Sequence, residues 1–101
     1  MYGRIAPRIL PQVYTKSSLA FGRQMHTAYK IGLADGINTF KEFNKVPGVR
    51  HDFVDFSTKT IYELKPYNPK QIQLGTQQLL RYKNAFEAQY GGTWNTVLDF
   101  Y

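Results

Sequence analysis

The sequence predicts a small α/β (α+β) domain, in which a short mixed sheet is flanked by helices. Two segments rich in β-branched and aromatic residues are separated by only three residues, and a long capped helical segment and a final strand follow them. A helical segment precedes this group. Helices that cover one sheet are the usual way of burying such a set of elements. We expect one domain over residues 1–101, because a chain of this length hardly accommodates two.

The composition excludes several classes of protein. The hydrophobic content of 43% and aromatic content of 16% support a modest core and are too high for a disordered tail. The chain has no cysteine, which excludes a disulfide scaffold and a zinc ribbon and fits a protein that acts in a reducing cytoplasm. Nothing approaches an apolar run of about 18 residues, so we expect no membrane span.

The first part of the chain predicts an extended segment, residues 1–16, followed by a helical region, residues 17–46. Residues 10–15 can extend as a short strand. Ser17 or Ser18 can cap a helix, because a hydroxyl there accepts from the first free backbone N–H groups. Apolar residues then recur at roughly helical spacing.

Either Gly32 or Gly36 is expected to end this first helix. A second short helix is predicted after it, because three apolar residues follow at steps of three: Ile37, Phe40 and Phe43.

The second half, residues 49–101, predicts a hairpin, a helix and a strand. Residues 49–56 and 60–65 are the two strands, and the three residues between them suit a hairpin connection. Asn68 is expected to cap the helix with Pro69 at its first position. Two glycines, Gly91 and Gly92, end the helix before a last strand over residues 93–101.

The positive charge lies in the first half of the chain. The formal net charge is +6, and residues 1–50 hold eight of the thirteen Lys and Arg but only two acids. A basic surface attracts a polyanion and supplies phosphate contacts, although ordinary solubilising charge explains the excess equally well. The candidates for nucleic-acid binding are Arg23, His26, Lys30, Arg50 and Arg81.

Two acids and a lysine form the candidate catalytic group. Glu63 and Lys65 are two apart on one strand and therefore share a face of the sheet. Asp52 lies on the neighbouring strand of the hairpin, where antiparallel pairing can bring it close to Glu63. Two carboxylates suit a hard divalent ion such as Mg²⁺, with Mn²⁺ or Zn²⁺ as alternatives, and a nearby lysine can stabilise charge on a reacting phosphate.

Two nearby residues have weaker claims. His51 is either a metal ligand or general base beside Asp52, or a residue that only occupies a variable position. Asp55 points away from Asp52 if the strand is regular, which makes it a supporting residue or a surface residue.

The run HDFVDFSTKTIYELKP, residues 51–66, resembles the active-site hairpin of the PD-(D/E)xK nuclease superfamily, which has the restriction-endonuclease-like fold. The resemblance implies that Asp52 and Glu63 bind the metal and that Lys65 completes the catalytic set. Gln78 and Tyr82, four apart on one helix face, resemble the Q-x-x-x-Y element of its RecB-like branches and are implied as further catalytic residues.

The resemblance covers roughly residues 49–101 and leaves one strand unplaced. The family core usually has another strand between the first helix and the aspartate strand. This strand is either shortened here or supplied by residues 10–15.

The same region resembles, more loosely, restriction-fold toxin domains of bacterial polymorphic toxins of the Rhs and contact-dependent inhibition types. That resemblance implies a cognate immunity protein as partner. It also implies delivery by a larger carrier protein into the cytoplasm of a target cell.

These observations lead us to expect a metal-dependent nuclease, with DNA ahead of RNA as substrate. An RNase of the same fold, for example one that cuts tRNA, is an alternative. A nucleic-acid-binding module with a degenerate site and a protein-interaction domain are the alternatives that lack catalysis.

Overall fold

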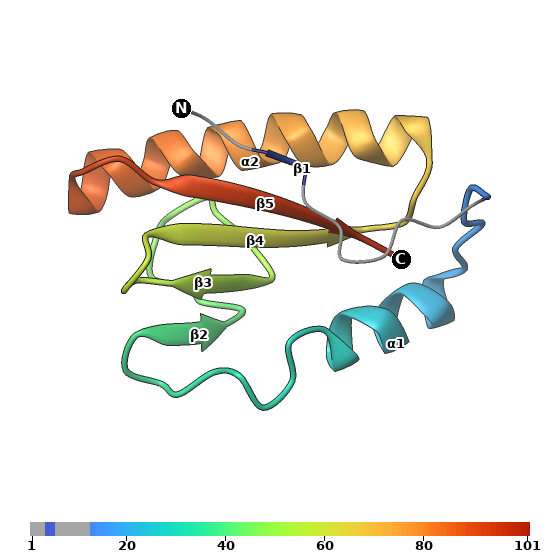
Figure 1. The fold of residues 1–101 in the computed structure, drawn as a ribbon, viewed down its shortest axis with the longest axis horizontal. Coiled ribbons are helices and arrows are strands. Elements are labelled where there is room, and N and C mark those ends of the chain that lie inside the picture. Colours follow the sequence, from blue (N-terminus) through green and yellow to red (C-terminus); the bar gives the residue numbers. More distant parts are fainter. Residues whose placement is uncertain (1–3, 6–12) are drawn as a thin grey trace.

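The structure is a computed structural model that describes residues 4–5 and 13–101 (Figure 1). Within these residues, two helices cover one five-stranded sheet. In chain order the elements are β1 (Arg4–Ile5), α1 (Leu19–Ala28), β2 (Thr39–Lys41), β3 (Phe53–Asp55), β4 (Thr60–Lys65), α2 (Pro69–Tyr90) and β5 (Asn95–Phe100).

The sheet is mixed, with the strand order β1-β5-β4-β3-β2. β1 and β4 both pair with β5 in parallel, whereas β3 pairs antiparallel with β4 and with β2. The predicted α/β class, a short mixed sheet flanked by helices, is therefore confirmed.

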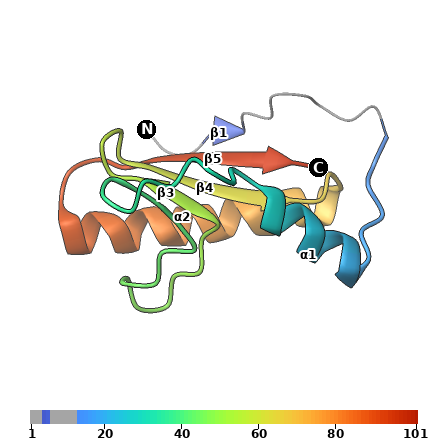
Figure 2. The same ribbon diagram turned by 90° about the horizontal axis from the view of Figure 1, so that it is seen from below.

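The two helices contact opposite faces of the sheet. α2 runs along β4 and β5, and α1 lies near the ends of these strands (Figures 1 and 2). Leu98 packs toward Gly75 of α2, while the next residue, Asp99, accepts a hydrogen bond from Tyr29 at the end of α1. Because successive side chains of a strand point to opposite faces, these two contacts place the helices on different sides.

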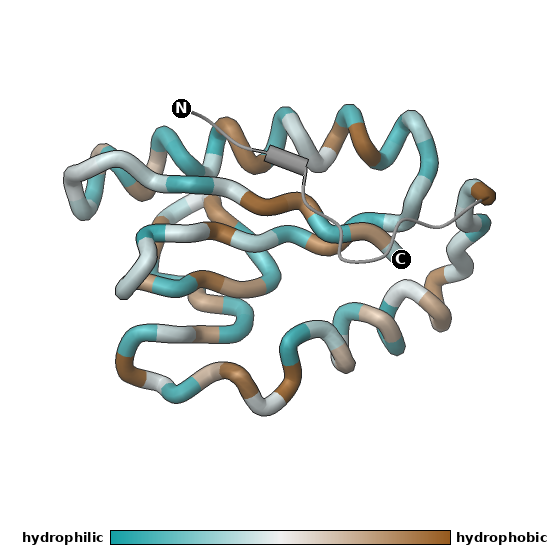
Figure 3. The backbone as a smooth tube through the Cα atoms, viewed as in Figure 1, coloured by the Kyte–Doolittle hydropathy of each residue, from teal (hydrophilic) through white to brown (hydrophobic). Residues whose placement is uncertain are grey.

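α2 is built from the signals that predict it. The Asn68 side chain accepts from the Gln71 N–H, Pro69 is the first helical residue, and Gly91 ends the helix with φ of 74°. Apolar residues recur along the helix between hydrophilic ones (Figure 3). The core lies between α2 and the face of the sheet that α2 covers. It includes Val54, Ile61, Leu79, Tyr82, Phe86, Trp94 and Leu98.

The predicted second helix within residues 17–46 is wrong. Residues 39–41 form β2, which pairs with β3. Asp35 explains the change of structure, because its carboxylate accepts from three successive N–H groups, those of residues 37 to 39, and turns the chain after Gly36. Glu42, with φ of 54°, then ends the strand. The family strand that the sequence left unplaced is thus present in shortened form.

Other boundaries also differ from prediction, and the last strand covers Asn95–Phe100 rather than residues 93–101. α1 ends at Ala28, before either glycine, and Lys30 there has a φ of 51°. The first hairpin strand covers Phe53–Asp55 rather than residues 49–56. Residues 13–15 form no strand, and residues 10–12 lie outside the described residues. In the part of the chain that the structure describes, no helix has the length and apolarity to cross a membrane.

Candidate active site

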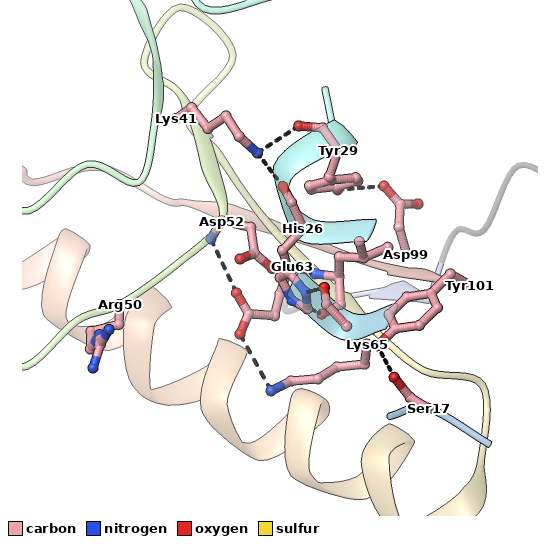
Figure 4. Close-up of polar contacts among 12 residues, drawn as sticks. Ser17, His26, Tyr29, Lys41, Arg50, Asp52, Glu63, Lys65, Asp99 and Tyr101 are labelled. Carbon is pink, nitrogen blue, oxygen red and sulfur yellow. Dashed lines mark hydrogen bonds and ion pairs between the residues drawn. The ribbon is translucent and has the colours of Figure 1, made fainter. Parts of the chain in front are cut away.

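The candidate site lies where β3 separates from β4. The Asp52 N–H, just before β3, points to the Tyr62 carbonyl (3.3 Å) and to Glu63 Oε1 (3.2 Å). The Asp52 carboxylate extends the pairing with β4 ahead of the first residue of β3, since its Oδ2 accepts from the Leu64 N–H at 2.7 Å. The side chain therefore takes the place of a strand partner and is fixed beside Glu63 (Figure 4).

Glu63 and Lys65 project together from β4, as their spacing predicts. Lys65 Nζ lies 3.7 Å from Glu63 Oε2, and the Glu63 side chain is only 6% exposed. Burial and then the charge of Asp52 raise the pKa of Glu63 to about 8, although Lys65 opposes this shift. Two carboxylates held together in a buried place thus repel each other, and a cation between them would relieve the repulsion.

His26 of α1 reaches the same place from the opposite face of the sheet. Its Nδ1 lies 2.8 Å from the Gly22 carbonyl, and its Nε2 lies 3.0 Å from the Leu64 carbonyl and 3.5 Å from Asp52 Oδ2. Carbonyl and carboxylate oxygens only accept hydrogen bonds. The ring therefore lies among oxygen acceptors on both sides, and its tautomer decides which of them it donates to.

The position of His26 depends on two contacts that hold the end of α1. Lys41 Nζ, from β2, donates to the carbonyls of His26 (2.6 Å) and Tyr29 (2.7 Å). A cation there also suits the negative end of the helix. The Tyr29 hydroxyl donates to Asp99 at 2.6 Å, and burial together with this hydrogen bond raises the pKa of Tyr29.

Tyr82 and Gln78 lie on the side of α2 that faces the sheet. The buried Tyr82 donates from its hydroxyl to the Arg50 carbonyl at 3.2 Å. Burial and then the nearby charge of Glu63 raise the pKa of Tyr82. Gln78, one turn earlier, has a buried side-chain oxygen without a hydrogen-bond partner among the described residues. α2 therefore carries an unsatisfied polar atom on the face that contains Tyr82.

Residues 14–101 match the family model of restriction endonuclease fold toxin 9, Tox-REase-9. The chain belongs to this family. Membership makes the domain a restriction-endonuclease-fold toxin domain and implies a nuclease toxin. Comparisons with curated proteins and with solved structures gave no match.

The donors available for a metal ion in this toxin domain are few. Within residues 4–5 and 13–101, no group of three or more His, Cys, Asp or Glu side chains is placed to hold an ion. The carboxylates of Asp52 and Glu63 do lie together. A pair of carboxylates suits Mg²⁺, which usually keeps several of its waters and takes only one or two protein carboxylates. The donor set therefore fits a hard divalent ion.

Most of the predicted nucleic-acid-binding residues lie outside the cluster. Arg23 is exposed on α1, and Lys30 follows that helix with its Nζ 4.1 Å from the centre of the Tyr62 ring. Arg50 lies apart from the carboxylates (Figure 4). Arg81 is exposed on α2, with its guanidinium 5.5 Å from the Tyr82 ring centre. Of the five, His26 is the one whose side chain lies against the Asp52 carboxylate.

His51 and Asp55 have structural roles in the toxin domain. His51 is 3% exposed, stacks on Phe43 at 6.0 Å, and has no hydrogen-bond partner for either ring nitrogen among the described residues. Burial lowers its pKa, which favours a neutral core ring. Asp55 holds the hairpin turn by accepting from the Ser57 N–H at 2.9 Å.

The raised pKa of Glu63 predicts how the metal-free domain responds to pH. The pKa of Glu63 is about 8 in the folded state and 4.5 ordinarily, so the folded state holds this proton more tightly than the unfolded chain does. The resulting stabilisation is complete at low pH and is lost as the pH rises through about 8. We expect the Tm in excess EDTA to fall between about pH 5 and pH 9. The fall should be smaller in Glu63→Gln. An equal fall in both proteins would show that Glu63 is not the group responsible.

Gly75 supplies a second prediction, because it gives Lys65 its room. A Cβ at Gly75 would lie 2.8 Å from Leu98 Cδ1 and 3.0 Å from Lys65 Cγ. Alanine gains about 1 kcal/mol of helix propensity, whereas overpacking costs about 1–3 kcal/mol. The balance runs from about zero to about 2 kcal/mol of destabilisation, so we expect Gly75→Ala to lower the Tm and also to lower cleavage by displacing Lys65. The matched control is Thr76→Ala on the exposed side of α2, which should leave cleavage unchanged.

Proposed function

We propose that this domain is a metal-dependent endonuclease of the PD-(D/E)xK type. The observation that carries the proposal is the placement of Asp52, Glu63 and Lys65 in one buried cluster at the separating strands. A buried group of two like charges costs stability, and such strain is typical of catalytic sites.

The chain's own residues have distinct parts in the proposed reaction. Asp52 and Glu63 would hold a divalent ion, Mg²⁺ before Mn²⁺ or Zn²⁺, which supplies Lewis acidity and a bound water of lowered pKa. Lys65 places its ammonium group beside the reacting phosphate and stabilises the charge that develops there. His26 and the Leu64 N–H orient the Asp52 carboxylate from its other side.

Gln78 and Tyr82 extend the proposal to the RecB-like branch. The unpartnered Gln78 oxygen supports a polar contact with substrate or water from α2. The Tyr82 hydroxyl holds the chain at Arg50, two residues before Asp52, and so supports a positioning role for Tyr82.

The substrate we propose is DNA, with RNA, such as tRNA, as the alternative. The test is incubation with plasmid DNA, single-stranded DNA and total RNA in Mg²⁺, Mn²⁺ or Zn²⁺, each with an EDTA control. Cleavage of any of them that needs the ion supports the nuclease. Binding without cleavage in every ion would favour the non-catalytic nucleic-acid module.

The biological setting we propose follows from the toxin family. A domain of an Rhs or contact-dependent inhibition toxin would be delivered by a larger carrier protein, act in the cytoplasm of the target cell, and be neutralised by a cognate immunity protein. Co-expression tests this setting, since the toxin should stop growth only when its immunity protein is absent.

Salt dependence tests the basic surface. Replacing Arg23, Lys30 and Arg50 together with glutamine should weaken nucleic-acid binding and make its salt slope shallower, by up to roughly 0.9 for each phosphate that the protein no longer neutralises. Fluorescence anisotropy from low to high salt measures both the affinity and the slope. An unchanged slope would remove these residues from the interface.

A further inference from the structure

A cavity adjoins Asp52 of the carboxylate cluster, and its walls carry polar groups that the proposed chemistry does not use. It has a volume of about 260 Å³ and lies between the end of β2 and the start of β3. Asp52 forms part of its wall and also contacts Glu63, so the cavity and the candidate site share one residue. A molecule in this cavity would lie next to Asp52.

Besides Asp52 and His51, three polar residues line the cavity: Glu42, Asn44 and Arg50, which carry a carboxylate, an amide and a guanidinium. All three are exposed, and in the described part of the chain no side-chain hydrogen bond or ion pair engages any of them. They are therefore available to a ligand that needs both an acceptor and a donor.

The backbone holds Glu42 at the cavity in a strained conformation. Its φ is 54°, which is uncommon for a residue other than glycine, and its N–H donates to the Asp52 carbonyl at 3.1 Å. Strain of this kind persists where the surrounding structure fixes it and is concentrated at ligand sites. Asp52 therefore holds the backbone of Glu42 at the cavity and also contacts Glu63 of the candidate site.

The size of the cavity suits one nucleobase. At roughly 30 Å³ for each water, it holds the volume of about nine water molecules. This leaves room for one planar ring system but not for a base pair. Phe43 and Val49 give part of the remaining wall an apolar character, against which a base can pack. His51 adds an imidazole ring whose nitrogens have no hydrogen-bond partner among the described residues.

We propose that this cavity binds an unpaired guanine next to the cleaved phosphate. The inference rests on the proposed nuclease function. Guanine offers two N–H donors on its Watson–Crick edge, which a carboxylate accepts, and its O6 and N7 accept from a guanidinium. Adenine would place its N1 acceptor against the Glu42 carboxylate. Because the edge that pairs in a duplex is the edge that is read, the substrate here is single-stranded or has a flipped base.

Nucleotide binding tests the cavity without any cleavage. 5′-dGMP, 5′-dAMP, 5′-dCMP and 5′-dTMP are titrated into the metal-free protein in EDTA and followed by amide NMR. We expect 5′-dGMP to shift the amides of residues 42–44 and 50–52 and to bind about tenfold or more tightly than 5′-dAMP. Glu42→Gln should abolish this preference, and Arg50→Gln should weaken the binding of 5′-dGMP. Lys70→Gln, an exposed charge on α2, is the control and should change neither.

Cut-site mapping on single-stranded oligonucleotides separates the two proposals. Wild type should cut next to guanine, and Glu42→Gln should cut without that preference. Equal affinity for the four nucleotides, or shifts confined to residues outside the cavity, would overturn the guanine site. Selective binding of 5′-dGMP in the cavity by a wild-type protein that cuts nothing would support the guanine site and reject the nuclease.

Discussion

Glu63→Gln is expected to lower cleavage by roughly 10²-fold or more, which is the scale of losing one preorganised electrostatic group. The substitution keeps the shape of the side chain and removes the charge that would hold a divalent ion with Asp52. Nucleic-acid binding should survive, because most of the proposed phosphate contacts lie elsewhere. Single-turnover cleavage, Mn²⁺ calorimetry and anisotropy on the same preparations measure the three properties separately.

The stability of the same variant distinguishes a functional site from a structural one. Removing one of two repelling carboxylates should leave the Tm in EDTA unchanged or higher at pH 8 and above. Glu87→Gln is the matched control, since Glu87 lies near the other end of α2, pairs with Lys83 and accepts from the Trp94 N–H. It should lower the Tm and retain cleavage. Full activity in Glu63→Gln would remove Glu63 from the reaction.

Lys65→Ala is expected to cause a reduction of similar size, about 10²-fold or more, by a different route. In the proposed reaction the ammonium group stabilises charge at the reacting phosphate, so its removal should slow the chemical step. Mn²⁺ affinity should change little, because both carboxylates remain. Lys70→Ala removes an equal charge from the exposed start of α2 and should retain activity.

The two variants together test the division of labour. If Lys65→Ala weakens metal affinity as severely as Glu63→Gln, the lysine acts by organising the carboxylates rather than at the phosphate. If Lys65→Ala keeps full cleavage, the ion pair of Lys65 with Glu63 has only a structural role.

The elements with strong local signals are predictable from sequence. Asn68 and Pro69 define the start of α2 and Gly91 its end, because capping and helix termination depend on neighbouring residues. β4 has the predicted bounds. The hairpin register then explains why Asp52 meets Glu63, since the pairing of Phe53 with Tyr62 brings the preceding and following residues together.

The parts that local patterns do not predict depend on contacts between distant residues. β2 has only three residues, and its pairing with β3 outweighs the helical spacing of Phe40 and its neighbours. The spacing of His26 groups it with the exposed charges of a helix face, yet it contacts the Leu64 carbonyl 38 residues away. No local pattern predicts that contact, because it depends on where Lys41 and Asp99 hold the end of α1.

The most direct test of the two-carboxylate and lysine site is cleavage by the wild-type domain with and without its ion. Plasmid and single-stranded DNA and total RNA are incubated in Mg²⁺, in excess EDTA, and in EDTA followed by excess Mg²⁺. We expect cleavage in Mg²⁺, none in EDTA, and recovery when Mg²⁺ is restored. Cleavage that persists in excess EDTA would contradict the proposed metal-dependent chemistry.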